Sequence, residues 1–249
     1  MRVLLVSDLH YDLRKLDWVL GEAGGVDLLV VAGDMLDIAS RVPLDAQIEV
    51  VLLYLSRFAE RTTTVVCSGN HDLDHRNDAG EKATAWLAEA RAGGVAVDWD
   101  SLTVQDWTVT ACGWWEGPVT LRALESTLEA AGRSRTGRWM WVWHGPPEGP
   151  LSWTGSRHHG DPELPRLLDT YRPDVVLCGH IHHAPFVSDG AWAERRGDTW
   201  LFNGGHQLGP VPTNISIDLA GGIASWWSFS SAGEISLGDA AVAAASGAQ

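Results

Sequence analysis

Carboxylate, imidazole and amide side chains recur in this sequence directly after short apolar segments. The segment Val3–Val6 is followed by Asp8 and His10, and the segment Leu28–Ala32 is followed by Asp34. Later apolar segments are followed by further groups of the same kind, namely Asn70, His71, His144, His180 and His182. This mixture of ligand types, without a cysteine, suits Mn²⁺, Fe or Zn²⁺ rather than a structural thiolate site. The pattern therefore indicates metal-dependent chemistry.

The apolar segments themselves are typical of strands buried on both faces, bounded by turn residues. In open α/β sheets, ligand groups collect at the carboxyl ends of such strands. One aspartate on a glycine turn commonly caps a helix, and one histidine is commonly a satisfied core or surface group. Capping or a satisfied histidine can explain one such residue. Neither explains why five strand ends in one chain all carry metal-binding side chains.

The remaining pattern predicts an α/β fold. Helical spacing of apolar residues predicts helices around 13–24, 45–60, 83–90, 121–131 and 164–171. Shorter alternating segments at 102–104 and 107–112 are expected to form antiparallel strands of a second sheet or layer, and further short strands are expected at 185–187, 199–202, 214–219 and 223–229. No linker divides the 249 residues, so we expect one domain over 1–238 and a flexible Ala/Gly/Ser-rich tail over 239–249.

Composition restricts the classes of partner. The formal charge is −14, which argues against non-specific binding to nucleic acid or to anionic membranes. The three scattered cysteines do not form a disulfide framework and suit a reducing compartment. Without a signal-peptide pattern or an apolar run of membrane-spanning length, the sequence predicts a cytoplasmic protein.

The ordered motifs resemble the calcineurin-like metallophosphoesterase family. The family pattern is D-x-H, GD-x-x-D, GNH-D/E, a single H, and GH-x-H. This chain has Asp8-Leu9-His10, Gly33-Asp34-Met35-Leu36-Asp37, Gly69-Asn70-His71-Asp72, His144 and Gly179-His180-Ile181-His182 in the same order. The resemblance covers roughly Val3 to Asn203. It implies a two-sheet αββα sandwich.

The resemblance also implies two divalent or mixed-valence metal ions. The first metal would be bound by Asp8, His10, Asp34 and His182. The second metal would be bound by Asn70, His144, His180 and the same Asp34. Four positive charges against two carboxylates leave an electropositive pocket, which suits a phosphate substrate.

The same resemblance implies hydrolysis of a phosphoester by a metal-activated water. His71 would act near the leaving group as an acid or as a charge stabiliser, and Asp37 would orient it. Asp72 could do the same, although a hydrogen bond within its loop is an equal alternative.

The sequence says less about the substrate. His144-Gly145-Pro146-Pro147 resembles the small single-domain phosphodiesterases that have HGPP as the fourth motif, which favours a small or nucleotide-type phosphodiester. A phosphomonoesterase acting on a small metabolite and a catalytically inactive interaction module are the alternatives. Trp114 and Trp115 could stack on a substrate base or pack against the sheet, and His206 could contact the phosphate.

Overall fold

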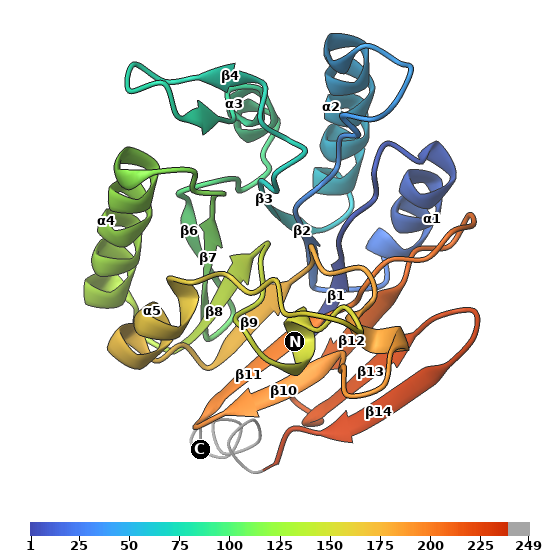
Figure 1. The fold of residues 1–249 in the computed structure, drawn as a ribbon, viewed down its shortest axis with the longest axis vertical. Helices are drawn as coiled ribbons and strands as arrows, with labels where there is room; N and C mark the ends of the chain where they lie inside the picture. The colour runs from blue at the N-terminus through green and yellow to red at the C-terminus, as the bar shows by residue number, and fades with distance from the viewer. Residues whose placement is uncertain (239–249) are drawn as a thin grey trace.

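Two six-stranded β-sheets pack face to face in the computed structural model, which describes residues 1–238 (Figure 1). The first sheet has the order β14 (Ala232–Ser236), β13 (Ile223–Trp227), β12 (Asn214–Asp218), β1 (Arg2–Val6), β2 (Leu28–Ala32) and β3 (Thr63–Cys67). The second sheet has the order β10 (Ala193–Arg196), β11 (Thr199–Asn203), β9 (Val175–Cys178), β8 (Arg138–Trp143), β7 (Trp107–Cys112) and β6 (Ser101–Val104).

The central strands of both sheets are parallel. In the first sheet β1, β2 and β3 run in one direction, and in the second sheet β7, β8, β9 and β11 do so. Antiparallel strands extend the sheets at their edges. Because parallel strands end at the same edge of a sheet, the loops that follow them can converge on one site.

Helices cover the outer face of each sheet. Beside the first sheet lie α1 (Leu13–Ala23), α2 (Leu44–Ala59) and α3 (Leu87–Ala92), and beside the second lie α4 (Pro118–Ser134) and α5 (Leu164–Tyr171). Alternate residues of each strand point to opposite faces. In β1, for example, Val3 and Leu5 belong to the core between the sheets, whereas Leu4 and Val6 pack with the helices. The predicted two-sheet αββα sandwich is therefore confirmed.

Some element predictions were wrong. The predicted strand at 185–187 is a 3₁₀ turn, η2 (Ala184–Phe186), in which the Phe186 amide donates to the His183 carbonyl oxygen. Pro185 has no amide hydrogen to give to a strand ladder, which favours this turn. The predicted helix at 83–90 begins later, at Leu87. The preceding residues form a hairpin of β4 (His75–Arg76) and β5 (Lys82–Ala83).

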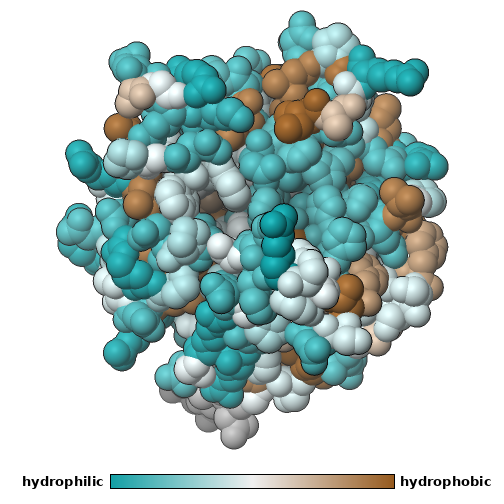
Figure 2. Space-filling model, in the orientation of Figure 1, coloured by the Kyte–Doolittle hydropathy of each residue, from teal (hydrophilic) through white to brown (hydrophobic). Residues whose placement is uncertain are grey.

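The edge strands β10 and β14 were not predicted, and β7 pairs in parallel with β8 as well as antiparallel with β6. A second 3₁₀ turn, η1 (Pro150–Ser152), lies in the loop after β8. The expected flexible tail at 239–249 lies outside the described residues. In the part of the chain that is described, no helix combines the length and the apolar character needed to cross a bilayer. The face shown in Figure 2 is mostly hydrophilic, with hydrophobic residues in small separate groups.

Candidate metal centre

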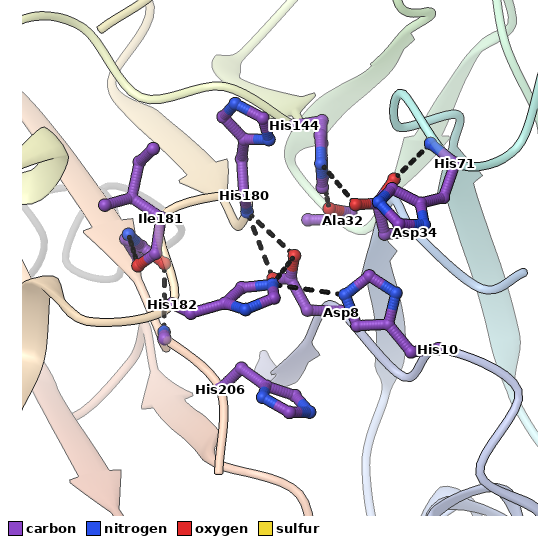
Figure 3. Close-up of polar contacts among 12 residues, drawn as sticks. Asp8, His10, Ala32, Asp34, His71, His144, His180, Ile181, His182 and His206 are labelled. Carbon is purple, nitrogen blue, oxygen red and sulfur yellow. Dashed lines mark hydrogen bonds and ion pairs between the residues drawn. The ribbon is translucent and has the colours of Figure 1, made fainter. Parts of the chain in front are cut away.

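The loops after β1, β2, β3, β8 and β9 bring the predicted ligand residues together at one end of the sandwich. Figure 3 shows two aspartates and six histidines from these loops and from the loop after β11 arranged around a common space. Asp8 and Asp34 come from the first sheet, and His144, His180 and His182 come from the second. The site therefore forms only where the two sheets meet.

One group of ligand atoms belongs to Asp8, His10 and His182. The His182 Nε2 atom lies 3.2 Å from the Asp8 Oδ1 atom and 3.1 Å from the His10 Nε2 atom. Asp8 is fully buried. Three donor atoms that converge this closely could hold a divalent cation.

A second group consists of Asp34, His144 and His180. The His144 Nε2 atom lies 3.3 Å from the Asp34 Oδ2 atom, and its Nδ1 atom lies 2.7 Å from the Ala32 carbonyl oxygen. That carbonyl accepts a hydrogen from Nδ1, so in the neutral ring Nε2 is the lone-pair nitrogen. Asp34 also belongs to a group with His10 and His71, so its carboxylate lies between both sets.

Several buried atoms at this site have no hydrogen-bond partner among residues 1–238. They are His144 Nε2, His10 Nδ1 and the Asn70 Oδ1 atom. Buried polar atoms in native proteins are normally paired, and an unpaired one calls for an explanation such as an ion. The Asn70 amide oxygen and the His144 nitrogen are suitable metal ligands, so the residues present fit a metal centre.

Three glycines permit the close approach of the ligand loops. A Cβ atom on Gly33 would lie 2.3 Å from the His144 Nδ1 atom, and one on Gly69 would lie 2.2 Å from the Asp34 Oδ1 atom. A Cβ atom on Gly179 would lie 2.6 Å from the Asp8 Oδ2 atom. The glycine of each motif therefore stands where any side chain would collide with a candidate ligand.

The turns that carry the ligands have left-handed backbone conformations. The φ angles are 53° at Asp8, 45° at His10, 55° at Asp34 and 67° at His180. Residues other than glycine adopt this region rarely, and when they do, the surrounding structure holds them there.

Asp72 supplies that support for Asp34. Its carboxylate accepts hydrogen bonds from the amides of Asp34, Leu36 and Gly69, at 2.8, 2.9 and 2.8 Å. Asp72 is 1% exposed, so these bonds are shielded from water. Asp72 therefore forms the expected hydrogen bond within its own loop, with the Gly69 amide, and two further bonds to the loop after β2.

Burial and charge shift the pKa values of these groups in opposite directions. Burial raises the pKa of Asp8 and of Asp34, but nearby histidines outweigh it and hold both below the usual range. Burial lowers the pKa of His144, whereas the charge of Asp34 raises it, to about 9. Burial and the neighbouring His144 lower the pKa of His180 to about 4. His180 is thus a neutral imidazole at neutral pH, as a metal ligand must be.

His71 lies at the edge of the same space. Its amide donates to the Asp34 Oδ1 atom at 2.8 Å, and its ring centroid lies 4.7 Å from that of His10. The Ile38 amide donates to the His71 Nδ1 atom at 3.4 Å, so in the neutral ring the proton is on Nε2. The Asp37 Oδ1 atom lies 3.9 Å from His71 Nδ1, an ion-pair contact but too long for a hydrogen bond.

A cavity of about 290 Å³ lies beside the second group of ligands. Trp114, Trp115, His159, Asp161 and His180 are among its lining residues. The Trp115 Nε1 atom donates to the Asp161 Oδ2 atom at 2.9 Å. The predicted pair of tryptophans therefore lies next to the centre and lines this cavity.

The ring of Trp114 also packs on the ligands. Its centroid lies 5.6 Å from that of His144 and 5.3 Å from that of His180. Trp114 thus both packs against these two histidines and lines the cavity.

A larger, open cavity of about 610 Å³ lies on the opposite flank, beside the first group. His10, His71, His182 and His206 line it, together with Lys15. The His206 ring centroid lies 4.7 Å from that of His182, so this predicted residue does reach the site. The Lys15 Nζ atom lies 2.7 Å from the His206 Nε2 atom.

Three residues at the site were not singled out from the sequence. They are Lys15, Gln47 and Asp161. Gln47 accepts from the Asp37 amide at 2.8 Å and donates to the Asp37 carbonyl oxygen at 3.0 Å, which fixes the loop after Asp34. The sequence offered one signal, a lysine on the apolar face of the helix at 13–24 in a chain with only two lysines.

A family model described as calcineurin-like phosphoesterase matches residues 1–184. The chain belongs to the calcineurin-like phosphoesterase family. All the strand ends that carry Asp8, Asp34, Asn70, His144 and His180 lie inside the matched part. No curated protein shows a significant match to this chain.

Several solved structures share the fold of this calcineurin-like phosphoesterase chain. TT1561 of Thermus thermophilus is 17% identical, with a TM-score of 0.60, over 95% of this chain and 98% of that one. A purple acid phosphatase from yellow lupin (Lupinus luteus) is 12% identical, with a TM-score of 0.54, over 96% and 52%. GAP50, described as the anchor in the inner membrane complex of Plasmodium, is 11% identical, with a TM-score of 0.53, over 95% and 88%. At these identities the likeness concerns the fold.

Proposed function

We propose that this chain is a dinuclear metal-dependent phosphohydrolase that prefers small or nucleotide-type phosphodiesters. The observation that carries the proposal is the position of Asp34. Its carboxylate belongs to one group with His144 and His180 and to another with His10, which is also a member of the group of Asp8 and His182. In this proposal Asp8, His10, Asp34 and His182 bind one cation. Asn70, His144, His180 and Asp34 bind the other. Mn²⁺, Fe and Zn²⁺ all suit this donor set.

Bound at this site, two divalent cations would supply a water of lowered pKa and positive charge for the phosphoryl oxygens. The protein residues do the rest. Asp72 and the glycines fix the loops, and burial keeps His180 neutral for binding. His71 presents its Nε2 hydrogen to the space beside His10, where it would donate a proton to the departing oxygen.

Two hollows flank the centre, and this favours a diester. A phosphodiester carries two substituents, and the cavities beside His180 and beside His182 could each receive one. A phosphomonoester carries only one substituent and would use one cavity. An inactive interaction module would need neither cavity.

The test compares hydrolysis of bis-p-nitrophenyl phosphate with that of p-nitrophenyl phosphate, with Mn²⁺ added to metal-free protein. A higher kcat/KM for the diester is the expected result. A higher value for the monoester would replace the diesterase proposal with the monoesterase one. Binding of metal without turnover of either ester would favour the interaction module.

The His71→Ala variant tests the proposed acid. We expect kcat to fall by about 10²- to 10⁴-fold, with metal content unchanged. Metal content is measured by mass spectrometry after gel filtration. His75→Ala is the control, because His75 is exposed on the β4–β5 hairpin. Loss of metal from the His71→Ala protein would instead identify His71 as a ligand.

A further inference from the structure

Lys15 is a buried cation without a countercharge. It lies in the first turns of α1, on the face that also buries Leu16 and Val19, and it is only 2% exposed. Its Nζ atom contacts the His206 Nε2 atom, and among residues 1–238 it forms no ion pair with a carboxylate. An ammonium group has three donors, of which this contact uses one. Burial of an uncompensated charge is costly and calls for an anionic partner.

The neighbouring charges do not supply that partner. Asp12, three residues before Lys15, pairs with Arg14 at 3.0 Å between the Asp12 Oδ2 and Arg14 Nη2 atoms, and it also caps the helix. Asp8 belongs to the proposed metal centre, where its carboxylate is in contact with His182. Both carboxylates are therefore already engaged, and the positive charge of Lys15 is left over beside the cavity that it lines.

His206 connects this lysine to the centre. The His206 ring is 4.7 Å from the ring of His182 and 5.5 Å from that of His10, measured between centroids. Its Nε2 atom accepts from the ammonium, so His206 holds Lys15 one ring beyond the proposed ligands. At that place Lys15 lines the same cavity as His10, His71 and His182.

The charge balance of the site favours a substrate that carries more negative charge than a single phosphate group. Two divalent cations against Asp8 and Asp34 leave two positive charges, which already match one phosphate group. Lys15 adds a third positive charge on the flank of His182, and a second anionic group would neutralise it.

We propose that Lys15, held by His206, binds a second phosphate bonded close to the scissile phosphate. The inference rests on the proposed phosphohydrolase function and names its substrate class as compounds with adjacent phosphates, such as nucleoside diphosphate derivatives. Lys15 and His206 then determine specificity. The scissile phosphate itself is bound at the metal centre.

The test uses the full chain loaded with Mn²⁺ and two probes, inorganic phosphate and inorganic pyrophosphate. Each is titrated at the same free Mn²⁺ concentration, because pyrophosphate also binds metal. The shift in melting temperature reports binding, and competitive inhibition of bis-p-nitrophenyl phosphate hydrolysis gives a second value. Wild-type protein is expected to bind pyrophosphate at least about 10-fold more tightly than phosphate.

The Lys15→Met variant removes the ammonium and keeps an apolar stem of similar length, which suits the buried position. Its affinity for pyrophosphate is expected to fall about 10-fold or more, and its affinity for phosphate less than about 3-fold. Lys82→Met is the matched control, because Lys82 is the other lysine of the chain and is exposed on β5. It is expected to leave both affinities unchanged. His206→Asn should shift the ratio in the same direction as Lys15→Met.

Equal losses for both probes in Lys15→Met would overturn the inference, because Lys15 would then act on the scissile phosphate or on the fold. An unchanged ratio would also overturn it. Melting curves without probe and metal contents show whether each variant is folded, and His206→Asn provides an independent variant if Lys15→Met is not. Tighter binding of pyrophosphate without turnover of any ester would refute the proposed function and leave the anion site standing.

Discussion

The two sheets contribute different chemistry to the candidate metal centre. Loops of the first sheet supply the candidate oxygen ligands Asp8, Asp34 and Asn70, together with His10. Loops of the second sheet supply imidazoles alone, namely His144, His180 and His182. The groups of Asp8, His10 and His182 and of Asp34, His144 and His180 each take members from both sheets.

The two sets are also held in different ways. The two aspartates of the first sheet lie in left-handed turns, and the turn of Asp34 is held by the three amides that Asp72 binds. Imidazoles of the second sheet depend more on side-chain surroundings, such as the Ala32 carbonyl behind His144 and the Trp114 ring beside His180. His180 also lies in a left-handed turn, so the two sheets differ in the added support, which is a buried carboxylate behind the turn of Asp34 and packed rings beside the imidazoles of the second sheet.

The strongest test of this comparison replaces Asp34, which the proposed function assigns as a ligand of both cations. Asp34→Asn should lower the affinity for both cations and reduce kcat/KM by more than the roughly 100-fold typical of outer partners. Metal content is measured by mass spectrometry after dialysis. Asp106→Asn, on the exposed turn between β6 and β7, is the control. Full occupancy of two metals in Asp34→Asn would refute the bridging role.

Replacement of Asp72, which supports the Asp34 turn, should have the next largest effect on metal binding. Asp72→Asn keeps the size of the side chain but replaces one acceptor oxygen with an amide that cannot accept from a backbone N–H group. We expect metal affinity to fall by about 10- to 100-fold, because Asp72 orients the Asp34 turn. Isothermal titration with Mn²⁺ measures this. Unchanged affinity would mean that the turn is held without Asp72.

In metal-free protein, the site residues of the two sheets should lose their contributions to stability in different pH ranges. Burial lowers the pKa of His180 to about 4 from the usual 6.5, so the unfolded state binds more protons between these values. Its contribution to stability is fully present above pH 6.5 and is lost as the pH falls toward 4. Asp8 and Asp34, whose pKa values are lowered from 3.8, lose their contributions only at lower pH.

The His144 pKa is raised to about 9, so its contribution is fully present below pH 6.5 and is constant in this window. Replacement of His180 by Asn should therefore reduce the loss of unfolding free energy between pH 6.5 and 4 by about 2 kcal/mol. Urea unfolding at several pH values in EDTA measures it. An identical pH dependence in His180→Asn would contradict the assignment.

The smallest effect on catalysis is expected when the ring that packs on His144 and His180 is removed. Trp114→Leu removes the ring beside His144 and His180 but keeps an apolar side chain in the cavity. We expect KM for bis-p-nitrophenyl phosphate to rise several-fold, in keeping with about 1 kcal/mol of stacking, and kcat to change less. Trp227→Leu, at a half-exposed position on β13, is the control. A fall in kcat alone would assign Trp114 to ligand positioning.

The ligand loops were predictable because local patterns encode them. An apolar strand followed by a turn and a polar residue is visible in the sequence at β1, β2, β3, β8 and β9, whereas the order of these strands in the two sheets is not. Lys15, Gln47 and Asp161 were not predictable, because each reaches the site from a helix or a long loop through contacts distant in sequence. The short edge strands β10 and β14 were not predicted for a related reason. Their strand conformation depends on pairing with a neighbouring strand more than on their own composition.

The position of the centre at the meeting edge of both sheets has a mechanical consequence. A cation bound between Asp34 and His180, or between Asp8 and His182, would join one sheet to the other through segments far apart in the chain. Sliding of one sheet over the other would then require release of the ion. Metal should therefore slow the opening of the sandwich, and amide exchange in β1, β2, β8 and β9 should become slower in step with metal concentration.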